Sequence, residues 1–212
     1  MKDTLMDVRG SYDSAASAYT EQLASELARK PLDRHLLNRF AEQTRGRGLV
    51  ADIGCGPGQV ARYLHDQGVT VVGIDLSAEM INCATRLNPG LDFRVGDMRQ
   101  LSLPDASLAG LVAFYSIVHF DSAELAGVML QLRRVLVPGG LALVAFHVGE
   151  QVVHVEELFG APVDLDFRYH VPGSVIEAMK SAQFAVMEQA EREPYEGAEH
   201  QSRRCYLLAR AV

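Results

Sequence analysis

The sequence contains no tryptophan and only three cysteines among its 212 residues. Cys55, Cys83 and Cys205 stand singly, so they provide neither a disulfide framework nor a paired-cysteine metal site. No apolar run approaches the roughly 20 residues of a membrane helix, and the segment MKDTLMDVRG lacks the apolar core of a secretion signal. We therefore expect a cytoplasmic protein with reduced thiols that neither spans nor binds a membrane.

Positive charge is also scarce. Acidic residues outnumber basic residues by 27 to 20, which gives a net charge of -7, and the lysines and arginines are scattered along the chain. Because this balance would repel a phosphate backbone, nucleic acid is not expected as a partner. The hydrophobic content of 48% is enough for one substantial core, and we expect one main domain with appendages.

Beyond Leu49, short apolar runs alternate with helical patterns, which is typical of a parallel sheet covered by helices on both faces. The polar segment 191–202 carries Pro194 and Gly197, which favours a hairpin and therefore an antiparallel final strand. The predicted fold is α/β, with a seven-stranded, mostly parallel sheet. Its strands are predicted at 49–53, 70–74, 91–95, 110–115, 140–147, 184–190 and 204–210.

Two helices carry recognisable caps. One has an apolar face from Leu125 to Leu136; the capping pair of Asp121 and Glu124 begins it, and the Pro-Gly-Gly segment at 138–140 ends it. Another is predicted from Ser174 to Ala182, with Ser174 as its cap.

Two further segments flank the main domain, which is predicted over 47–212. Residues 1–46 are predicted to form a helical lid divided by Pro31, and residues 149–173 an irregular insert. Ligands of open α/β sheets bind beyond the carboxyl ends of the strands. We expect the lid and the insert to cover that edge.

Three alternating glycines follow the first predicted strand. Gly54, Gly56 and Gly58 remove side chains from a turn, so that a ligand can approach backbone amides at a helix start. Asp75, at the end of the second strand, is placed to accept hydrogen bonds from two ribose hydroxyls, which implies a nucleoside. The third glycine falls one residue early for the dinucleotide fingerprint GxGxxG, which disfavours a nicotinamide oxidoreductase.

These motifs resemble the class I S-adenosylmethionine-dependent methyltransferases, particularly the group that includes ubiquinone and menaquinone biosynthesis enzymes. The resemblance implies a Rossmann-like fold, S-adenosyl-L-methionine as cofactor and S-adenosyl-L-homocysteine as product. It is carried by YDSAASAY (12–19), DIGCGPG (52–58), GIDLS (73–77), GDM (96–98) and LRRVLVPGGLAL (132–143).

By this resemblance, the three glycines line the methionine portion of the cofactor, and Asp52 supports the ammonium group of that portion. Asp97 faces the adenine amine and Met98 packs on the ring. In the plainer reading, Asp75 caps a helix, Asp97 is a turn residue and Met98 belongs to the core. The cofactor-binding residues implied are Tyr12, Tyr19, Asp52, Gly54, Gly56, Gly58, Asp75, Leu76, Asp97, Met98 and Tyr115.

Candidate catalytic residues lie at the ends of the fourth and fifth strands: Tyr115, His119 and His147. Methyl transfer from a sulfonium mainly requires alignment and exclusion of water, and a histidine base is needed only when the acceptor arrives protonated. His119 could equally pack near the cofactor. An arginine such as Arg168, Arg203 or Arg204 could pair with a substrate carboxylate. No metal is implied.

The predicted activity is methyl transfer to an oxygen, nitrogen or carbon of a small-molecule acceptor, by a monomer or homodimer. The alternative is a non-catalytic, S-adenosylmethionine-binding regulatory or partner protein of the same fold. The sequence leaves the identity of the acceptor open.

Overall fold

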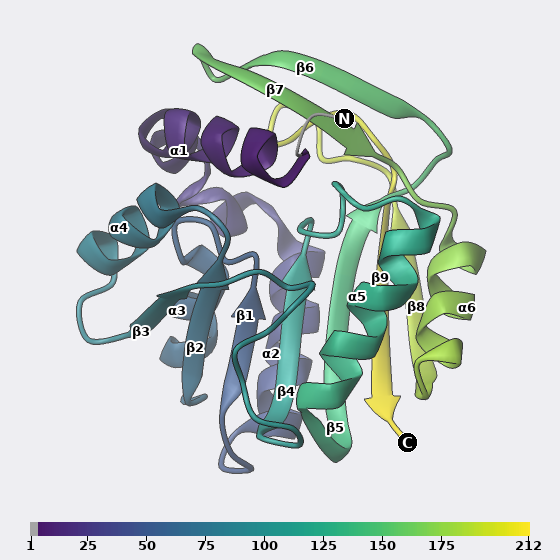
Figure 1. Cartoon of the computed structure of the whole chain (residues 1–212). Helices are drawn as coiled ribbons and strands as arrows, with labels where there is room; N and C mark the ends of the chain where they lie inside the picture. Colours follow the sequence, from purple (N-terminus) through teal and green to yellow (C-terminus); the bar gives the residue numbers. More distant parts are fainter. Residues whose placement is uncertain (1–3) are drawn as a thin grey trace.

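The computed structural model describes residues 4–212, with side chains from Val8 onward. Its main feature is a seven-stranded sheet in the order β3-β2-β1-β4-β5-β9-β8 (Figure 1). Neighbours from β3 to β5 are parallel, and β9 is antiparallel to both β5 and β8. The predicted fold class is confirmed. The strands are β1 (Val50–Ile53), β2 (Val71–Asp75), β3 (Asp92–Val95), β4 (Leu108–Phe114), β5 (Leu136–His147), β8 (Phe184–Arg192) and β9 (Arg204–Ala211).

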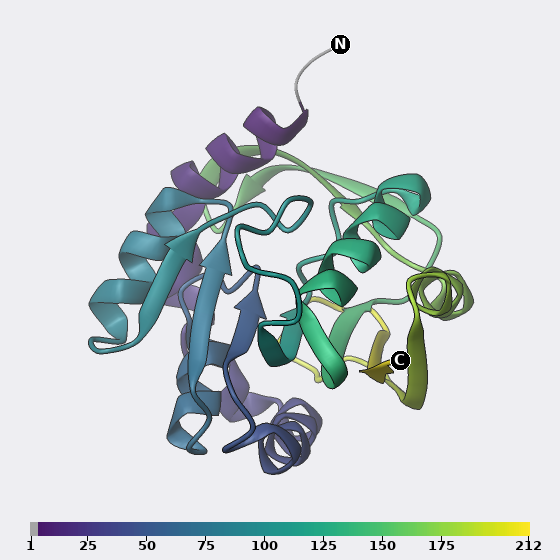
Figure 2. The ribbon, with the colours of Figure 1, turned by 60° about the horizontal axis from the view of Figure 1, so that its bottom comes forward.

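Helices cover the two faces of the sheet (Figure 2). On one face, α2 (Pro31–Thr44) and α3 (Gln59–Asp66) bury their apolar side chains, and on the other α5 (Ser122–Val135) and α6 (Pro172–Ser181) do so. The short α4 (Ala78–Leu87) packs beside β2 and β3. Since most of β4 is buried on both sides, its sequence is a continuous apolar run without alternation. The four residues of β1 are buried as well, but one of them is polar, Asp52.

The capping predictions have different outcomes. Asp121 and Glu124 form the predicted capping box at the start of α5. The start predicted for α6 at Ser174 is wrong, because the helix already begins at Pro172 and Val171 provides no side-chain cap. Proline suits a first helical position, where its fixed φ is helical and its missing N–H is not needed.

The amino-terminal segment forms α1 (Thr4–Leu23) and a short 3-10 turn, η1 (Glu26–Arg29), and Pro31 then starts α2, as the predicted division requires. The helix α1 lies across the carboxyl ends of the strands, whereas α2 belongs to the layer on the sheet face, where its Leu37 and Phe40 are fully buried (Figure 1). Within residues 4–212, no helix is both long and apolar enough to cross a membrane.

The irregular insert predicted over 149–173 is wrong. Most of it is an antiparallel hairpin of β6 (Val152–Leu158) and β7 (Ala161–Arg168), which packs along α1 (Figure 1). Its strands alternate exposed and partly covered residues, as a two-sided hairpin does. The turn consists of Phe159 and Gly160 and lacks the Asn-Gly or Asp-Gly pair that usually marks such a turn in a sequence.

Candidate functional site

Two adjoining cavities lie at the carboxyl ends of the parallel strands. Each has an empty volume of about 930 Å³, including its mouth. The β2-side cavity reaches Asp75 and Asp97, and the β5-side cavity reaches His147 and the hairpin. They adjoin each other, because six residues line both: Tyr12, Tyr19, Gly54, Gly56, Phe114 and Tyr115.

The three glycines of the loop serve different purposes. All have left-handed φ values, 73° at Gly54, 52° at Gly56 and 83° at Gly58. A Cβ on Gly54 would lie 2.3 Å from the Cβ of Ser116, and one on Gly58 would lie 2.7 Å from the ring of Phe93. Only at Gly56 does the position of a Cβ open toward the site, with the Tyr19 ring 3.7 Å away. The predicted contact role therefore suits Gly54 and Gly56, whereas Gly58 lines neither cavity and serves the packing of α3.

Two carboxylates stand in the wall of the β2-side cavity. Asp75 accepts hydrogen bonds from the amides of Gly56, at 2.8 Å, and Ser77, at 2.9 Å, and burial raises its pKa. Asp97 pairs with the guanidinium of Arg99 at 3.0 Å, and its side chain is a quarter exposed. Leu76 and Met98 line the same cavity, so the structure brings together the residues expected at the ribose and the adenine.

A third carboxylate, Asp52, lies at the β5-side cavity. It is 1% exposed and accepts a hydrogen bond from the amide of Ala61, in the first turn of α3, at 2.9 Å. Burial outweighs this bond and raises the pKa of Asp52 to about 7. Two buried oxygen atoms of cavity-lining residues, Gln59 Oε1 and Ser116 Oγ, have no hydrogen-bond partner in the described part of the chain. Unsatisfied polar atoms of this kind suit a site built for a polar ligand.

The helix α1 and the β6–β7 hairpin, which together cover the site, are joined through His119. Its Nδ1 lies 3.0 Å from the carbonyl oxygen of Asp166 in β7, and its Nε2 lies 2.9 Å from the hydroxyl of Tyr12 in α1. Because a carbonyl only accepts, Nδ1 carries the proton and Nε2 accepts from Tyr12. Burial lowers the pKa of His119 to about 4. Both ring nitrogens are thus engaged in joining α1, β7 and the segment after β4.

Residues 12–19, YDSAASAY, also attach α1 to the start of α4. Asp13 accepts hydrogen bonds from the hydroxyl of Ser77, at 2.6 Å, and the amide of Glu79, at 3.2 Å, both at the start of α4. Ala16 is buried next to Met80. Tyr12 and Tyr19 meet edge to face, with 6.1 Å between ring centroids. The two tyrosines predicted to close over a cofactor therefore face the glycine loop from a firmly attached helix.

Tyr115 lines both cavities and forms part of the floor of the site. Its φ of 55° is left-handed, a conformation that is strained for a non-glycine residue. The Tyr115 hydroxyl lies 3.2 Å from Asp33 Oδ1 and 2.8 Å from the hydroxyl of Tyr206, and burial raises its pKa. The ammonium of Lys30 lies 5.1 Å from the ring centroid. Tyr115 is consequently a neutral ring held in place by buried partners.

A buried ionic network lies beneath this floor, and the sequence did not reveal it. Arg192 pairs with Asp33, at 3.0 Å, and with Glu199. Glu199 also pairs with Arg204, at 3.0 Å, and Lys30, at 3.5 Å. Burial alone would raise the pKa of Glu199, but Arg192 and the other donors lower it to about 2. No local pattern reveals these pairs, because the partners come from α2 and the residue before it, from β8 and β9, and from the loop between those two strands.

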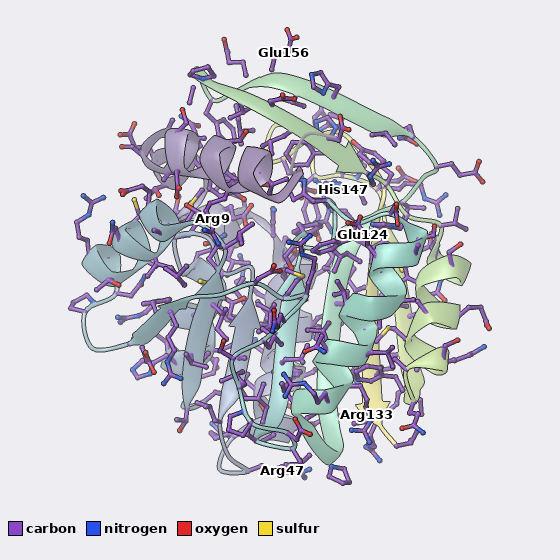
Figure 3. All side chains as sticks on the ribbon, in the orientation of Figure 1. Arg9, Arg47, Glu124, Arg133, His147 and Glu156 are labelled. Atoms are coloured by element: carbon purple, nitrogen blue, oxygen red, sulfur yellow. The ribbon has the colours of Figure 1, made fainter. Side chains whose placement is uncertain are left out.

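His147 closes the far end of the β5-side cavity. Its Nδ1 lies 2.6 Å from the hydroxyl of Ser202, and its ring stacks on Tyr169 with centroids 5.2 Å apart. Burial, followed by the nearby Arg204, lowers the pKa of His147 to about 3. Figure 3 shows His147 between the end of β5 and the hairpin, whereas Glu156 projects from the outer side of the hairpin. Among residues 4–212, no hydrogen bond engages His147 Nε2.

The arginines proposed for a substrate carboxylate have other partners. Arg203 is about half exposed and pairs with Glu191. Arg204 is 2% exposed and donates to the backbone oxygens of His200 and Ser202. Arg168 lies 4.0 Å from Asp166. Across the part of the chain that the structure describes, no group of three or more histidine, cysteine, aspartate or glutamate side chains could hold a metal ion.

Comparison with known proteins agrees with this architecture. Residues 50–140, which span the glycine loop and strands β1 to β4, match a family model described as a methyltransferase domain. The methyltransferase-domain match over this part of the chain, together with methyltransferase relatives and structural neighbours, supports the class I S-adenosylmethionine-dependent methyltransferase family. The family prediction made from the loop motifs is confirmed, and S-adenosylmethionine is the cofactor of this family.

Two relatives illustrate the range of acceptors among similar methyltransferases. A malonyl-[acyl-carrier protein] O-methyltransferase of Serratia marcescens is 30% identical over 133 residues, which cover 61% of this chain and 51% of the relative. A dTDP-3-amino-3,6-dideoxy-alpha-D-glucopyranose N,N-dimethyltransferase of Streptomyces fradiae is 37% identical over 96 residues, 45% of this chain and 38% of the relative. The chain thus spans about half, or less, of the length of these relatives.

The similarity in fold extends over the whole chain. The crystal structure of magnesium protoporphyrin IX methyltransferase from Synechocystis, which contains bound S-adenosylmethionine, aligns with a TM-score of 0.72. The alignment covers 100% of this chain and 99% of that one, at 16% sequence identity. At this identity the likeness establishes the methyltransferase fold and leaves the acceptor undetermined.

Proposed function

We propose that this chain transfers the methyl group of S-adenosylmethionine to an oxygen, nitrogen or carbon of a small-molecule acceptor. One observation carries the proposal: the site of two adjoining cavities at the carboxyl edge combines an open backbone at Gly56 with a carboxylate at Asp75, beneath α1 and the hairpin. A nucleoside with a charged amino-acid tail needs these features.

The residues present fit this cofactor. Asp75 would accept from the ribose hydroxyls, and Asp97 with Met98 would hold the adenine in the β2-side cavity. Asp52 would face the ammonium group at the junction with the β5-side cavity. The partnerless oxygens of Gln59 and Ser116 provide further acceptors.

Bound S-adenosylmethionine supplies a methyl group on a sulfonium that is already activated for displacement. The protein's own contribution is then to align the acceptor and exclude water. Tyr12 and Tyr19 exclude water from the α1 side, and the hairpin does so from above the β5-side cavity. Tyr115 provides the rigid floor between the two cavities.

The two candidate histidines differ in what they can do. His119 has both nitrogens engaged, so we assign it a positioning role in the cover. His147 keeps a free nitrogen at the β5-side cavity, where the acceptor would lie. With a pKa of about 3, His147 is neutral at physiological pH and a weak base, which suits orienting an acceptor better than deprotonating one.

We infer a small, polar acceptor, because α1 and the hairpin lie over the carboxyl edge and polar groups line the β5-side cavity beside apolar ones. A cytoplasmic location and a monomeric or homodimeric state stay predictions. The three separate thiols are consistent with a reducing compartment.

Incubation of the protein with methyl-labelled S-adenosylmethionine and a fractionated small-molecule extract tests the proposal. Label transferred to a small molecule by the wild-type chain, and more slowly by His147→Gln, supports it. Binding of S-adenosylhomocysteine without transfer to any fraction would favour the non-catalytic alternative. Efficient labelling of DNA, RNA or intact protein would contradict the small-molecule assignment.

A further inference from the structure

The tip of the hairpin has an unexpected residue in a strained conformation. Leu158 pairs with Ala161, so the turn contains only Phe159, with φ 54°, and Gly160, with φ 85°. Two left-handed residues make this a type I′ turn, whose first position favours asparagine, aspartate or glycine. Phenylalanine has no side-chain polar group that could compensate there. The residue is also 45% exposed, so burial alone does not explain its presence.

The ring of Phe159 begins a chain of aromatic contacts that returns to the same hairpin. It meets Tyr19 edge to face, with centroids 5.8 Å apart, and Tyr19 meets Tyr12 at 6.1 Å. Tyr12 meets His119 at 5.4 Å, and His119 meets Phe167 of β7 at 5.2 Å. We call these five residues the aromatic clasp. It links the tip of the hairpin to α1, and α1 to β7 of the same hairpin.

Tyr19 is the member of the clasp that faces the glycine loop. Its ring lies 3.7 Å from the position of a Cβ on Gly56, and it lines both cavities. Among residues 4–212, no hydrogen bond holds the Tyr19 hydroxyl, so ring packing fixes its orientation. Phe159 supplies that packing from the outer side and itself lines the β5-side cavity.

We propose that Phe159 is a positioning residue for the cofactor: it holds Tyr19 against the glycine loop and so slows the escape of the bound nucleoside. The inference rests on the proposed function. This role explains why a strained phenylalanine stands in the turn. An asparagine at position 159 would relax the backbone, but it would remove the ring that packs against Tyr19.

The remainder of the hairpin is attached independently of its tip. The amide of Asp164 donates to the hydroxyl of Ser11 at 2.9 Å, and His119 bridges Tyr12 to the Asp166 carbonyl. A substitution at Phe159 therefore loosens the tip and leaves the hairpin docked on α1.

The test compares Phe159→Asn with the wild-type chain, using S-adenosylhomocysteine as the probe. Without ligand, the melting temperature of Phe159→Asn should equal or exceed that of the wild type, because the turn is relaxed. The S-adenosylhomocysteine dissociation constant should rise by about 2- to 10-fold, the range expected for losing one aromatic pair, mainly through faster dissociation in stopped-flow measurements. Phe159→Tyr, which keeps the ring, should restore wild-type binding.

Gln183→Gly is the matched control. Gln183 has φ 63° and lies between the end of α6 and the start of β8. These two element ends are at the end of the sheet opposite to α1 and the hairpin (Figure 1). Relief of the strain at Gln183 should raise the melting temperature and leave S-adenosylhomocysteine binding unchanged.

Wild-type affinity and dissociation rate in Phe159→Asn would overturn the inference while leaving the proposed function intact. A lower melting temperature in Phe159→Asn, with the expected rise in Gln183→Gly, would also overturn it, because Phe159 would then serve folding. Absence of S-adenosylhomocysteine binding by the wild-type chain would contradict the proposed function itself, and the inference with it.

Discussion

Replacement of Asp52 by asparagine should have opposite effects on stability and on cofactor affinity. Asp52 is 1% exposed and receives one hydrogen bond, from the amide of Ala61, which an asparagine oxygen can also accept. Burial raises the pKa of Asp52 to about 7, from 3.8 for the unperturbed group. The substitution therefore removes a charge that is costly to bury and keeps the local hydrogen bond.

The sign of the stability effect follows from proton binding. Between about pH 4 and pH 7 the unfolded chain has released the Asp52 proton and the folded chain retains it, so the free energy of unfolding falls as the pH rises. At about 1.4 kcal/mol per pH unit, this loss amounts to up to about 4 kcal/mol above pH 7. Asp52→Asn should lack this loss, so its gain in stability over the wild type should be larger at pH 8 than at pH 5.

The sign for binding is opposite. If the ionised carboxylate holds the ammonium group, S-adenosylhomocysteine affinity rises as Asp52 ionises. With a pKa of about 7, the ionised fraction increases up to about eightfold between pH 6 and pH 7.5, and the wild-type association constant should follow it. Asp52→Asn should bind more weakly at pH 7.5 and show no such rise.

Urea unfolding and calorimetry at pH 5, 6, 7.5 and 8 measure both effects. Asp66→Asn is the control, since Asp66 ends the same helix, α3, and its side chain is 49% exposed. Neither the pH dependence of stability nor that of binding should change in this variant. Equal affinity of Asp52→Asn and the wild type at pH 7.5, with the same pH dependence, would refute the assignment of Asp52 to the ammonium group.

Three further predictions concern the cavity walls. Asp75→Asn should weaken S-adenosylhomocysteine binding in calorimetry by about 1 to 3 kcal/mol, or roughly 5- to 150-fold, since a charged acceptor is lost; the exposed Asp92→Asn should not, and equal affinity in both variants would remove Asp75 from the site. Gly56→Val should keep a folded circular dichroism spectrum, despite a backbone cost of about 1 to 2 kcal/mol at its left-handed φ, and should lose the rise in melting temperature with ligand; a normal rise would contradict the cradle role of the loop. His147→Gln should lower turnover without changing cofactor affinity, whereas His154→Gln, on the exposed face of the hairpin, should leave both unchanged. Because the pKa of His147 is about 3, the pH profile of the wild-type turnover should show no acidic limb near pH 6.5. An acidic limb there that disappears in His147→Gln would instead identify His147 as a titrating base.

The sequence was informative where a local pattern has one structural meaning. The apolar runs predicted the seven strands of the main sheet, and the polar segment before the last strand predicted its antiparallel direction. The spacing of Gly54 and Gly56 and the position of Asp75 predicted a nucleoside-binding edge, and these residues do meet there.

The rest depended on contacts between distant segments. The hairpin was missed because Phe159 replaces the usual turn residue, for a reason that lies in α1. The pairing of Asp33 with Arg192 and of Glu199 with Lys30 could not be foreseen, because charged residues in separate polar segments are normally solvated. No rule of sequence spacing could show that the Tyr12 hydroxyl donates a hydrogen bond to Nε2 of His119.

Calorimetric titration of the wild-type chain with S-adenosylhomocysteine at pH 7.5 tests the central claim most directly. The account predicts saturable binding of one molecule per chain, abolished by Gly56→Val, with no binding of NAD under the same conditions. Absence of binding by the wild-type chain, or binding that Gly56→Val leaves unchanged, would contradict it.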